Sequence, residues 1–237
     1  MAGVAAADMQ RMADTPDLLE TTSAASSAAR WLTTRANVKT AMRIGTTEMD
    51  ALIDFLIPRA SALIVGACGL ATDNISSLPT FGLETLRATF RNSGRSRGPV
   101  LTLPWRVPVA SITACVEDGV TLVAGTDYEL ASAKPGKIRR LNESSPTLWS
   151  SAAIVVTFAA GWSLPEGVPP DLEAAAIEQI RAMVFAARRD PAIRSENVPD
   201  VASKSYALPG GDTFTGVILP QVVSALAASG YQNPMPI

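Results

Sequence analysis

The sequence contains no histidine among its 237 residues. Histidine is the commonest general base near neutral pH and the commonest metal ligand, so its absence argues against Ser-His-Asp, Cys-His and ordinary zinc chemistry. There are two cysteines, Cys68 and Cys115, without the spacing of a metal site. We interpret them as buried thiols in a reducing compartment, with a disulfide as the alternative. We expect no catalytic residue, cofactor or metal, and predict that the chain is not an enzyme.

Aromatic residues are also scarce, at 5% of the chain, and charged residues make up 18% against 47% hydrophobic. This composition predicts a core of small side chains in one large or two small domains. The net charge of −2 disfavours binding to DNA through bulk charge. No apolar run reaches the roughly 18 residues that a membrane span needs, and the start lacks the features of a secretion signal. We therefore expect a protein made in the cytoplasm, without a membrane partner.

Two helices are expected near the start of the folded sequence, over 33–65. Thr33 or Thr34 can cap the first, short helix, and Gly45 is a good helix stop. Pro58 lies inside the second helix and should kink or split it. The side chains that the second helix is expected to bury are Leu52, Phe55, Leu56, Leu63 and Ile64.

A β region is predicted over 81–162. Residues 81–91 alternate partly as a strand does, with Glu84, Leu86, Ala88 and Phe90 on one side, and a helix is the alternative. The run Glu117-Asp118-Gly119 is typical of a hairpin turn, which we prefer to a catalytic carboxylate pair. Further strands are expected at 128–130, 137–141 and 154–159, and Trp105, Trp149 and Trp162 are expected to fill the core or cover a subunit contact.

A long helix is predicted over 170–189, with a proline in its first turn. The tail, 192–237, is rich in Pro and Gly, contains one possible helix at 220–228, and should pack on its own domain or on a neighbour. The predicted fold class is α+β. A flexible N-terminal arm, 1–30, precedes a core, 31–191, in which a small helical bundle carries an inserted small antiparallel β-sheet, and the tail follows.

One segment of the sequence matches the residue pattern of an enzyme motif. Gly94-Arg95-Ser96-Arg97-Gly98 fits the G-x-S-x-G nucleophile elbow. That motif needs a helix after it and a histidine to activate the serine, whereas here a proline and a strand follow and histidine is missing. We interpret the match as chance, and a hydrolase using Ser96 is kept only as an alternative.

Five arginines form a local concentration of positive charge: Arg87, Arg91, Arg95, Arg97 and Arg106. They could contact phosphates or an acidic partner surface. The alternative is a solvated strand face and loop. We prefer a protein partner to DNA because the whole chain is acidic, and the candidate partner-binding residues from this group are Arg87, Arg91, Arg95 and Arg97.

Several short sequence motifs, which we call phrases, follow one another between about Leu32 and Arg189. They are Leu32-Thr33-Thr34 with Val38-Lys39 and Met42-Arg43-Ile44, then Asp50-Ala51-Leu52-Ile53, Leu103-Pro104-Trp105-Arg106-Val107-Pro108, Asp118-Gly119-Val120, Asp127-Tyr128-Glu129-Leu130, Ala160-Gly161-Trp162 and Val168-Pro169-Pro170-Asp171-Leu172. In their order and spacing these phrases resemble the tailed-bacteriophage head–tail connector (adaptor) family.

This resemblance implies a structural function without catalysis. Such adaptors form a ring, usually of twelve subunits, beneath the portal protein in the neck of the virion, and related particles such as gene transfer agents use the same part. The ring extends the channel through which DNA passes without specific binding, and it docks a stopper or tail protein. Pro220, Val222, Leu226 and Tyr231 resemble the family's C-terminal contact with the portal or a neighbouring subunit, although Gln232 replaces a basic residue. The alternatives are a stopper, a tail terminator or a nucleic-acid-binding module.

Overall fold

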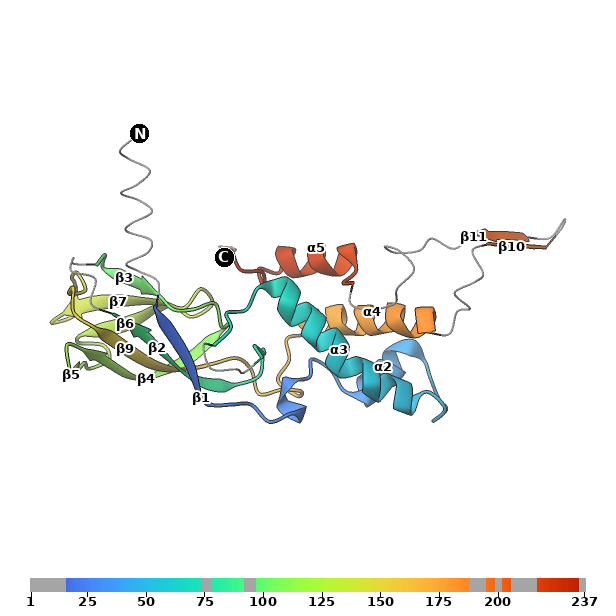
Figure 1. Cartoon of the computed structure of the whole chain (residues 1–237), viewed down its shortest axis with the longest axis horizontal. Helices are drawn as coiled ribbons and strands as arrows, with labels where there is room; N and C mark the ends of the chain where they lie inside the picture. The colour runs from blue at the N-terminus through green and yellow to red at the C-terminus, as the bar shows by residue number, and fades with distance from the viewer. Residues whose placement is uncertain are drawn as a thin grey trace, which may run out of the picture. The chain divides into compact units, whose positions relative to one another are not determined.

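The computed structural model of the chain describes residues 16–73, 78–91, 97–187, 195–198, 202–205 and 217–234. The chain divides into two compact units (Figure 1). A β unit is made of Met1–Arg30, Gly69–Gly167 and Asn233–Ile237, and a helical unit is made of Trp31–Cys68 and Val168–Gln232. The sequence predicted one core over 31–191; in the structure the helices on either side of the β region lie in one unit with the tail as far as Gln232.

The β unit contains two antiparallel sheets. The strands of the first, in spatial order, are β1 (Leu18–Ser23), β2 (Glu84–Phe90), β9 (Ile154–Ala160), β4 (Val109–Glu117) and β5 (Val120–Thr121). Those of the second are β3 (Val100–Thr102), β7 (Lys137–Asn142) and β6 (Tyr128–Ser132), with β8 (Ser145–Pro146) also paired to β7. Side chains from both sheets share one apolar core around Trp149 and Phe158. The α+β class is confirmed, but the predicted single small sheet is two sheets.

The predicted strand alternation is confirmed in β2. Glu84, Leu86, Ala88 and Phe90 are buried, and the residues between them are not. The predicted hairpin turn joins β4 to β5, with positive φ at Asp118 and Gly119, which is the conformation that the tightest hairpins need. Both the period of two and the Asp-Gly signal were therefore correct guides to this sheet.

The N-terminal arm is a correction to the sequence prediction. Part of it, residues 18–23, forms β1, which pairs antiparallel with β2 in register from Leu18 opposite Thr89. Leu19 is buried in the core, and a short 3-10 helix, η1 (Ala28–Arg30), follows. Only one side chain of β1 is buried, so its sequence shows no alternation of apolar and polar residues. The position of β1 is set by its pairing with β2, which is distant in the sequence. Residues 1–15 lie outside the described residues.

The helical unit contains α2 (Arg35–Met42), α3 (Asp50–Cys68), α4 (Pro170–Ala187) and α5 (Pro220–Ala228) (Figure 1). α3 contacts each of the other three helices, and α4 contacts α2 and α5. The α2, α3 and α4 core is made of Val38, Ile53, Leu56, Ile57, Ala60, Ile180, Met183 and Val184. Between α4 and α5, β10 (Ser195–Val198) pairs antiparallel with β11 (Ala202–Ser205), which the sequence did not predict.

The ends of α2 follow their sequence signals closely. The hydroxyl of Thr34 accepts a hydrogen bond from the backbone N–H of Asn37 at 3.2 Å, so the predicted N-cap is confirmed. The helix ends at Arg43 in the left-handed conformation (φ 56°), two residues before the glycine that was expected to stop it. α2 and α3 are then held by Asp50, which accepts from Lys39 Nζ at 2.6 Å and from Arg35 Nη1 at 3.2 Å.

Helix α3 runs through Pro58 without being split. α3 is long and apolar enough to cross a membrane by length and composition alone, a test that a core helix also passes. Its buried face packs against the other helices, however, and its outer face carries Asp54 and Arg59. These are the features of a core helix. Phe55, which was expected to be buried, is 52% exposed.

Candidate functional site

The described members of the predicted arginine group differ in exposure: Arg87 and Arg91 are exposed, whereas Arg97 and Arg106 are buried. Arg87 is exposed on β2 and donates from Nε to Glu20 at 2.7 Å. Arg91 is exposed, and its carbonyl oxygen accepts from the guanidinium of Arg97. Arg97 itself is buried and donates to two further backbone carbonyls, at 3.0 and 2.8 Å. Arg95 lies outside the described residues. Arg97 thus closes a loop of its own chain, and a partner contact by this group stays a prediction.

Arg106 is also structural. Its Nη1 donates to Glu84 at 3.0 Å, and both side chains are almost completely buried. Glu84 also accepts from Arg30 Nη2 at 3.0 Å and from the backbone N–H of Ala25 at 3.2 Å. Burial lowers the pKa of the Arg106 guanidinium, and the charges of Glu84 and Asp73 oppose that effect. The Glu84 carboxylate thus holds the segment between β1 and β2 in place. The alternation of residues 81–91 predicted that Glu84 shares a face with apolar side chains, but not that it forms a buried ion pair.

The predicted C-terminal contact residues lie against their own unit. Val222, Leu226 and Tyr231 are buried, and α5 packs on α3 and α4. The hydroxyl of Tyr231 donates to Asp171 at 2.8 Å; burial and this hydrogen bond both raise the pKa of Tyr231. Pro220, at the first turn of α5, is exposed. The buried side chains of Val222, Leu226 and Tyr231 therefore hold α5 against its own unit. A contact between these residues and a partner stays a prediction.

Gln179 holds the start of α5 and was missed by the sequence reasoning. It is buried on α4, where its Nε2 donates to the carbonyl of Val217 at 3.2 Å and its Oε1 accepts from the N–H of Leu219 at 3.0 Å. A polar side chain within the apolar stripe of a helix is a recognisable signal, because a buried amide needs partners of its own. Here those partners are the backbone groups that precede α5.

Three described groups that could do chemistry, Glu117 and the two cysteines, are buried. Glu117 is buried, pairs with Arg140 at 2.8 Å and accepts from the N–H of Ser150 at 2.7 Å. Cys68 and Cys115 are free and buried, as predicted, and burial raises the pKa of each thiol to about 12. Within the described ranges no three His, Cys, Asp or Glu side chains lie close enough to hold a metal ion. Ser96 lies outside those ranges.

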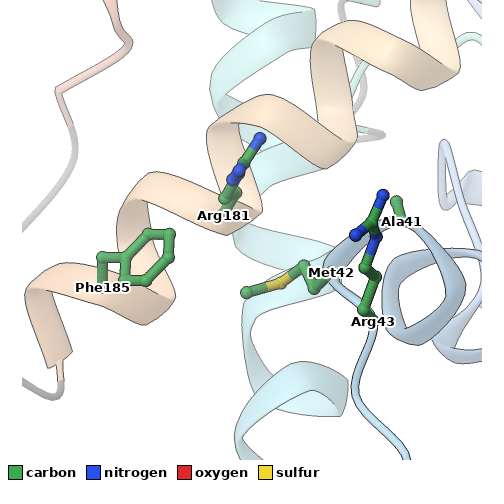
Figure 2. Close-up of a pocket in the computed structure, with 5 residues that line it drawn as sticks. All are labelled: Ala41, Met42, Arg43, Arg181 and Phe185. Atoms are coloured by element: carbon green, nitrogen blue, oxygen red, sulfur yellow. The ribbon is translucent and has the colours of Figure 1, made fainter.

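The large apolar side chains that the described helices of the helical unit expose lie at two places; Val217, which precedes α5, is also exposed. One is a pocket of about 420 Å³ between the end of α2 and α4, lined by Ala41, Met42, Arg43, Arg181 and Phe185 (Figure 2). Phe185 is 57% exposed. The other is Phe55 on α3, whose ring lies 3.5 Å from the guanidinium carbon of Arg59. In the β unit, Val120, Val123 and Leu148 are the most exposed large apolar side chains apart from Leu78.

A comparison with solved structures finds the same fold in a phage-like particle. A chain from the neck of an empty gene transfer agent (GTA) particle, computed with C6 symmetry, matches 93% of this chain and 97% of its own length, with a TM-score of 0.50 and 19% identity. The chain has a neck-protein fold. The fold implied by the connector-like sequence phrases is therefore confirmed.

Two other solved structures give similar but weaker matches. A chain from the neck of a native GTA particle, computed with C12 symmetry, has a TM-score of 0.45 and 19% identity over 92% of this chain and 97% of its own. A chain from the virion of a native GTA particle has a TM-score of 0.49 and 22% identity over 92% and 96%. No protein-family model and no curated protein matches the chain.

Proposed function

We propose that this chain is a structural head-to-tail adaptor (connector) of a tailed phage or a phage-like particle. In this proposal the subunits form a ring, of about twelve copies, that lies below the portal in the neck of the virion. The ring extends the DNA channel and docks a stopper or tail protein. The observation that carries the proposal is the fold likeness to a GTA neck chain over nearly the whole length of both chains.

The chemistry of the chain supports a structural role. The net charge of −2 suits a channel wall past which DNA moves without being held. Several arginines of the β unit, including Arg97 and Arg106, are engaged by carboxylates and carbonyls of the same chain. The half-exposed Phe55 and Phe185, in contrast, leave apolar surface on the helical unit, which is typical of contact sites between proteins.

Mass photometry of the purified chain, alone and with the portal protein of the same particle, tests the proposal. We expect a uniform species with the mass of about twelve copies of the 24.8 kDa chain, which adds to the portal ring as one unit. A chain that stays monomeric and never binds a portal would contradict the proposal. A DNA titration at increasing salt provides a second check: a steep loss of affinity would instead favour a nucleic-acid-binding module.

A further inference from the structure

A guanidinium group without an ionic partner stands at the end of α2. Arg43 caps this helix in the left-handed conformation (φ 56°), which glycine adopts freely and a residue with a long side chain adopts at a cost. The side chain of Arg43 is exposed, and it forms no ion pair with any described residue. Residues held in this conformation cluster at binding sites, so Arg43 is a candidate for a contact outside its own chain.

Arg43 lines the pocket between the end of α2 and α4. Arg181 and Phe185 lie one turn apart on α4, across the opening from Met42 and Arg43 of α2 (Figure 2). We call the opening with its five lining residues, given above, the Met42–Phe185 pocket. It combines two guanidinium groups with an aromatic ring and a thioether, and its volume is about 420 Å³, which is within the range of sites that bind small groups.

The chemistry of the pocket favours a carboxylate with an apolar group beside it. Glu178 approaches Arg181 only to 3.7 Å, which is beyond hydrogen-bond distance, and both side chains are about half-exposed. Because a guanidinium has five N–H donors, Arg181 can accept a second carboxylate, as Arg43 can a first. The exposed ring of Phe185 gives an apolar neighbour of the bound carboxylate a surface to pack on. The occupant is therefore acidic and apolar at once.

The β4–β5 hairpin of the same chain carries such a group. Within the described ranges, four exposed carboxylates form no ion pair and accept no hydrogen bond: Glu48, Asp118, Glu143 and Glu166. Of these four, Asp118 is the one that lies within two residues of an exposed large apolar side chain, Val120 at 63%. We call Asp118, Gly119 and Val120 the Asp118 tip.

The Asp118 tip is a tight turn at the edge of the five-stranded sheet. It joins β4 to β5 in two residues, both with positive φ (50° and 76°). Val120 pairs with Glu117, whose carboxylate accepts from the N–H of Ser150 at 2.7 Å. The segment that carries Leu148, which is 58% exposed, therefore lies beside this end of β4 and adds apolar surface to that of the tip.

We propose that the Asp118 tip of one copy inserts into the Met42–Phe185 pocket of the next copy. The carboxylate of Asp118 then pairs with Arg43 and Arg181, and Val120 packs on the apolar lining. The occupant is a second copy because the chain itself carries both complementary surfaces, a basic and apolar pocket on the helical unit and an acidic and apolar tip on the β unit. This inference rests on the proposed ring: a head-to-tail contact uses two different surfaces of each subunit and repeats around the ring.

The first test separates the contact from the fold at Arg43. Because glycine suits the left-handed cap, the Arg43→Gly monomer should melt near the wild-type temperature. Its association should nevertheless weaken by about tenfold or more, because one partner of a charge pair is lost. Arg59→Gln, which removes another exposed arginine of the helical unit, is the control and should leave the ring intact. If the wild-type chain forms rings and Arg43→Gly forms them equally well, the inference is wrong while the proposed function stands.

The tip has a matched control in the other sheet. Asp118→Asn keeps the turn, since Asn-Gly is a preferred two-residue hairpin sequence, but removes the charge. Glu143→Gln removes an exposed carboxylate from the first position of a similar two-residue turn, between β7 and β8, where φ is also positive (49°). We expect Asp118→Asn to lower the ring fraction measured by mass photometry and Glu143→Gln to leave it unchanged. Equal ring fractions in the two variants would contradict the pairing.

Charge exchange tests the pairing itself. Arg43→Asp and Asp118→Arg should each reduce the ring fraction, and the double variant should recover it, because the pair is then re-formed with reversed charges. A double variant that folds but forms no more ring than the single variants would overturn the pairing. If Arg43→Gly keeps the ring but loses portal binding, the pocket belongs to the portal and the inference is wrong. If the wild-type chain forms no ring even with the portal, the proposed function fails and the inference fails with it.

Cross-linking gives a direct readout of proximity. Ala41→Cys, in the pocket lining, and Val120→Cys, in the tip, should together yield a ladder of linked multimers with a short bis-maleimide. Each single variant should yield no ladder, and the native thiols, both buried, serve as the background. Rings of the double variant that show no ladder would contradict the contact. A cross-link within a single chain would contradict it too, because the tip and the pocket would then meet without a second copy.

Discussion

Replacing Glu84 with glutamine removes the charge that compensates buried Arg106. The carboxylate accepts from Arg106 Nη1 and Arg30 Nη2, each at 3.0 Å, and the side chains of Glu84 and Arg106 are only 1% and 2% exposed. A glutamine amide keeps one acceptor but turns an NH₂ group towards a guanidinium. Breaking a buried pair by removing one partner costs about 3–5 kcal/mol, because the other charge stays buried without compensation.

Urea unfolding followed by tryptophan fluorescence measures this loss, because three of the four tryptophans lie in the β unit. With a slope of about 2 kcal/mol per molar, Glu84→Gln should lower the urea midpoint by roughly 1.5–2.5 M. The matched control is Glu20→Gln, the same change in the neighbouring strand. Its partner Arg87 has a side chain that is 49% exposed, and a pair of that kind is worth only about 0–1 kcal/mol.

A double variant separates the charge from the packing. Glu84→Leu with Arg106→Met replaces the buried ion pair by apolar side chains, and such replacements are often neutral or stabilising. We expect it to unfold at higher urea than Glu84→Gln. The reasoning would be refuted if Glu84→Gln unfolded at the wild-type midpoint, or if it lost no more stability than Glu20→Gln.

Two further predictions concern the helical unit and the thiols. Leu226→Ala should cost about 2–5 kcal/mol and speed hydrogen exchange in α5, because Leu226 is buried; Gln221→Ala, at an exposed position of α5, is the control, and equal exchange in the two variants would show that α5 is not fixed by packing. Cys68 and Cys115 should react with a thiol reagent at pH 8 only on unfolding. Their folded pKa of about 12 lies above the ordinary 9.0, so their contribution to stability is complete below pH 9 and is lost as pH rises towards 12. Chemical unfolding at pH 8 and pH 10 checks the sign: a variant with both cysteines replaced by alanine should lose less stability between these pH values, and an equal loss would contradict it.

Much of the fold could be predicted from local pattern. The alternation in β2, the Asp118-Gly119 turn, the Thr34 cap and the proline start of α4 each depend on residues close in sequence, so the signal is visible in one window. The strand β1 is different. Its one buried side chain, Leu19, gives no period, and its place is set by pairing with β2, about 65 residues away. Non-local pairing of this kind is not encoded in local composition.

The candidate site was harder to predict because exposure is a tertiary property. Phe55 and Leu56 are neighbours of similar hydrophobicity, yet the first is half-exposed and the second is buried. Conversely, the sequence suggests that Arg97 and Arg106 are surface charges, but both are buried. Arg97 donates to loop carbonyls, and Arg106 pairs with Glu84 of β2. Sequence composition therefore indicated an assembly protein, whereas only the packing of α3 and α4 shows which aromatic side chains are left for a partner.

Electron cryomicroscopy of the purified chain mixed with the portal protein of the same particle tests the central proposal most directly. A closed ring of about twelve copies, stacked below the portal and continuing its channel, is the predicted result. Portal rings with no added density, beside free monomers of this chain, would contradict it, and so would density for this chain away from the neck in intact particles.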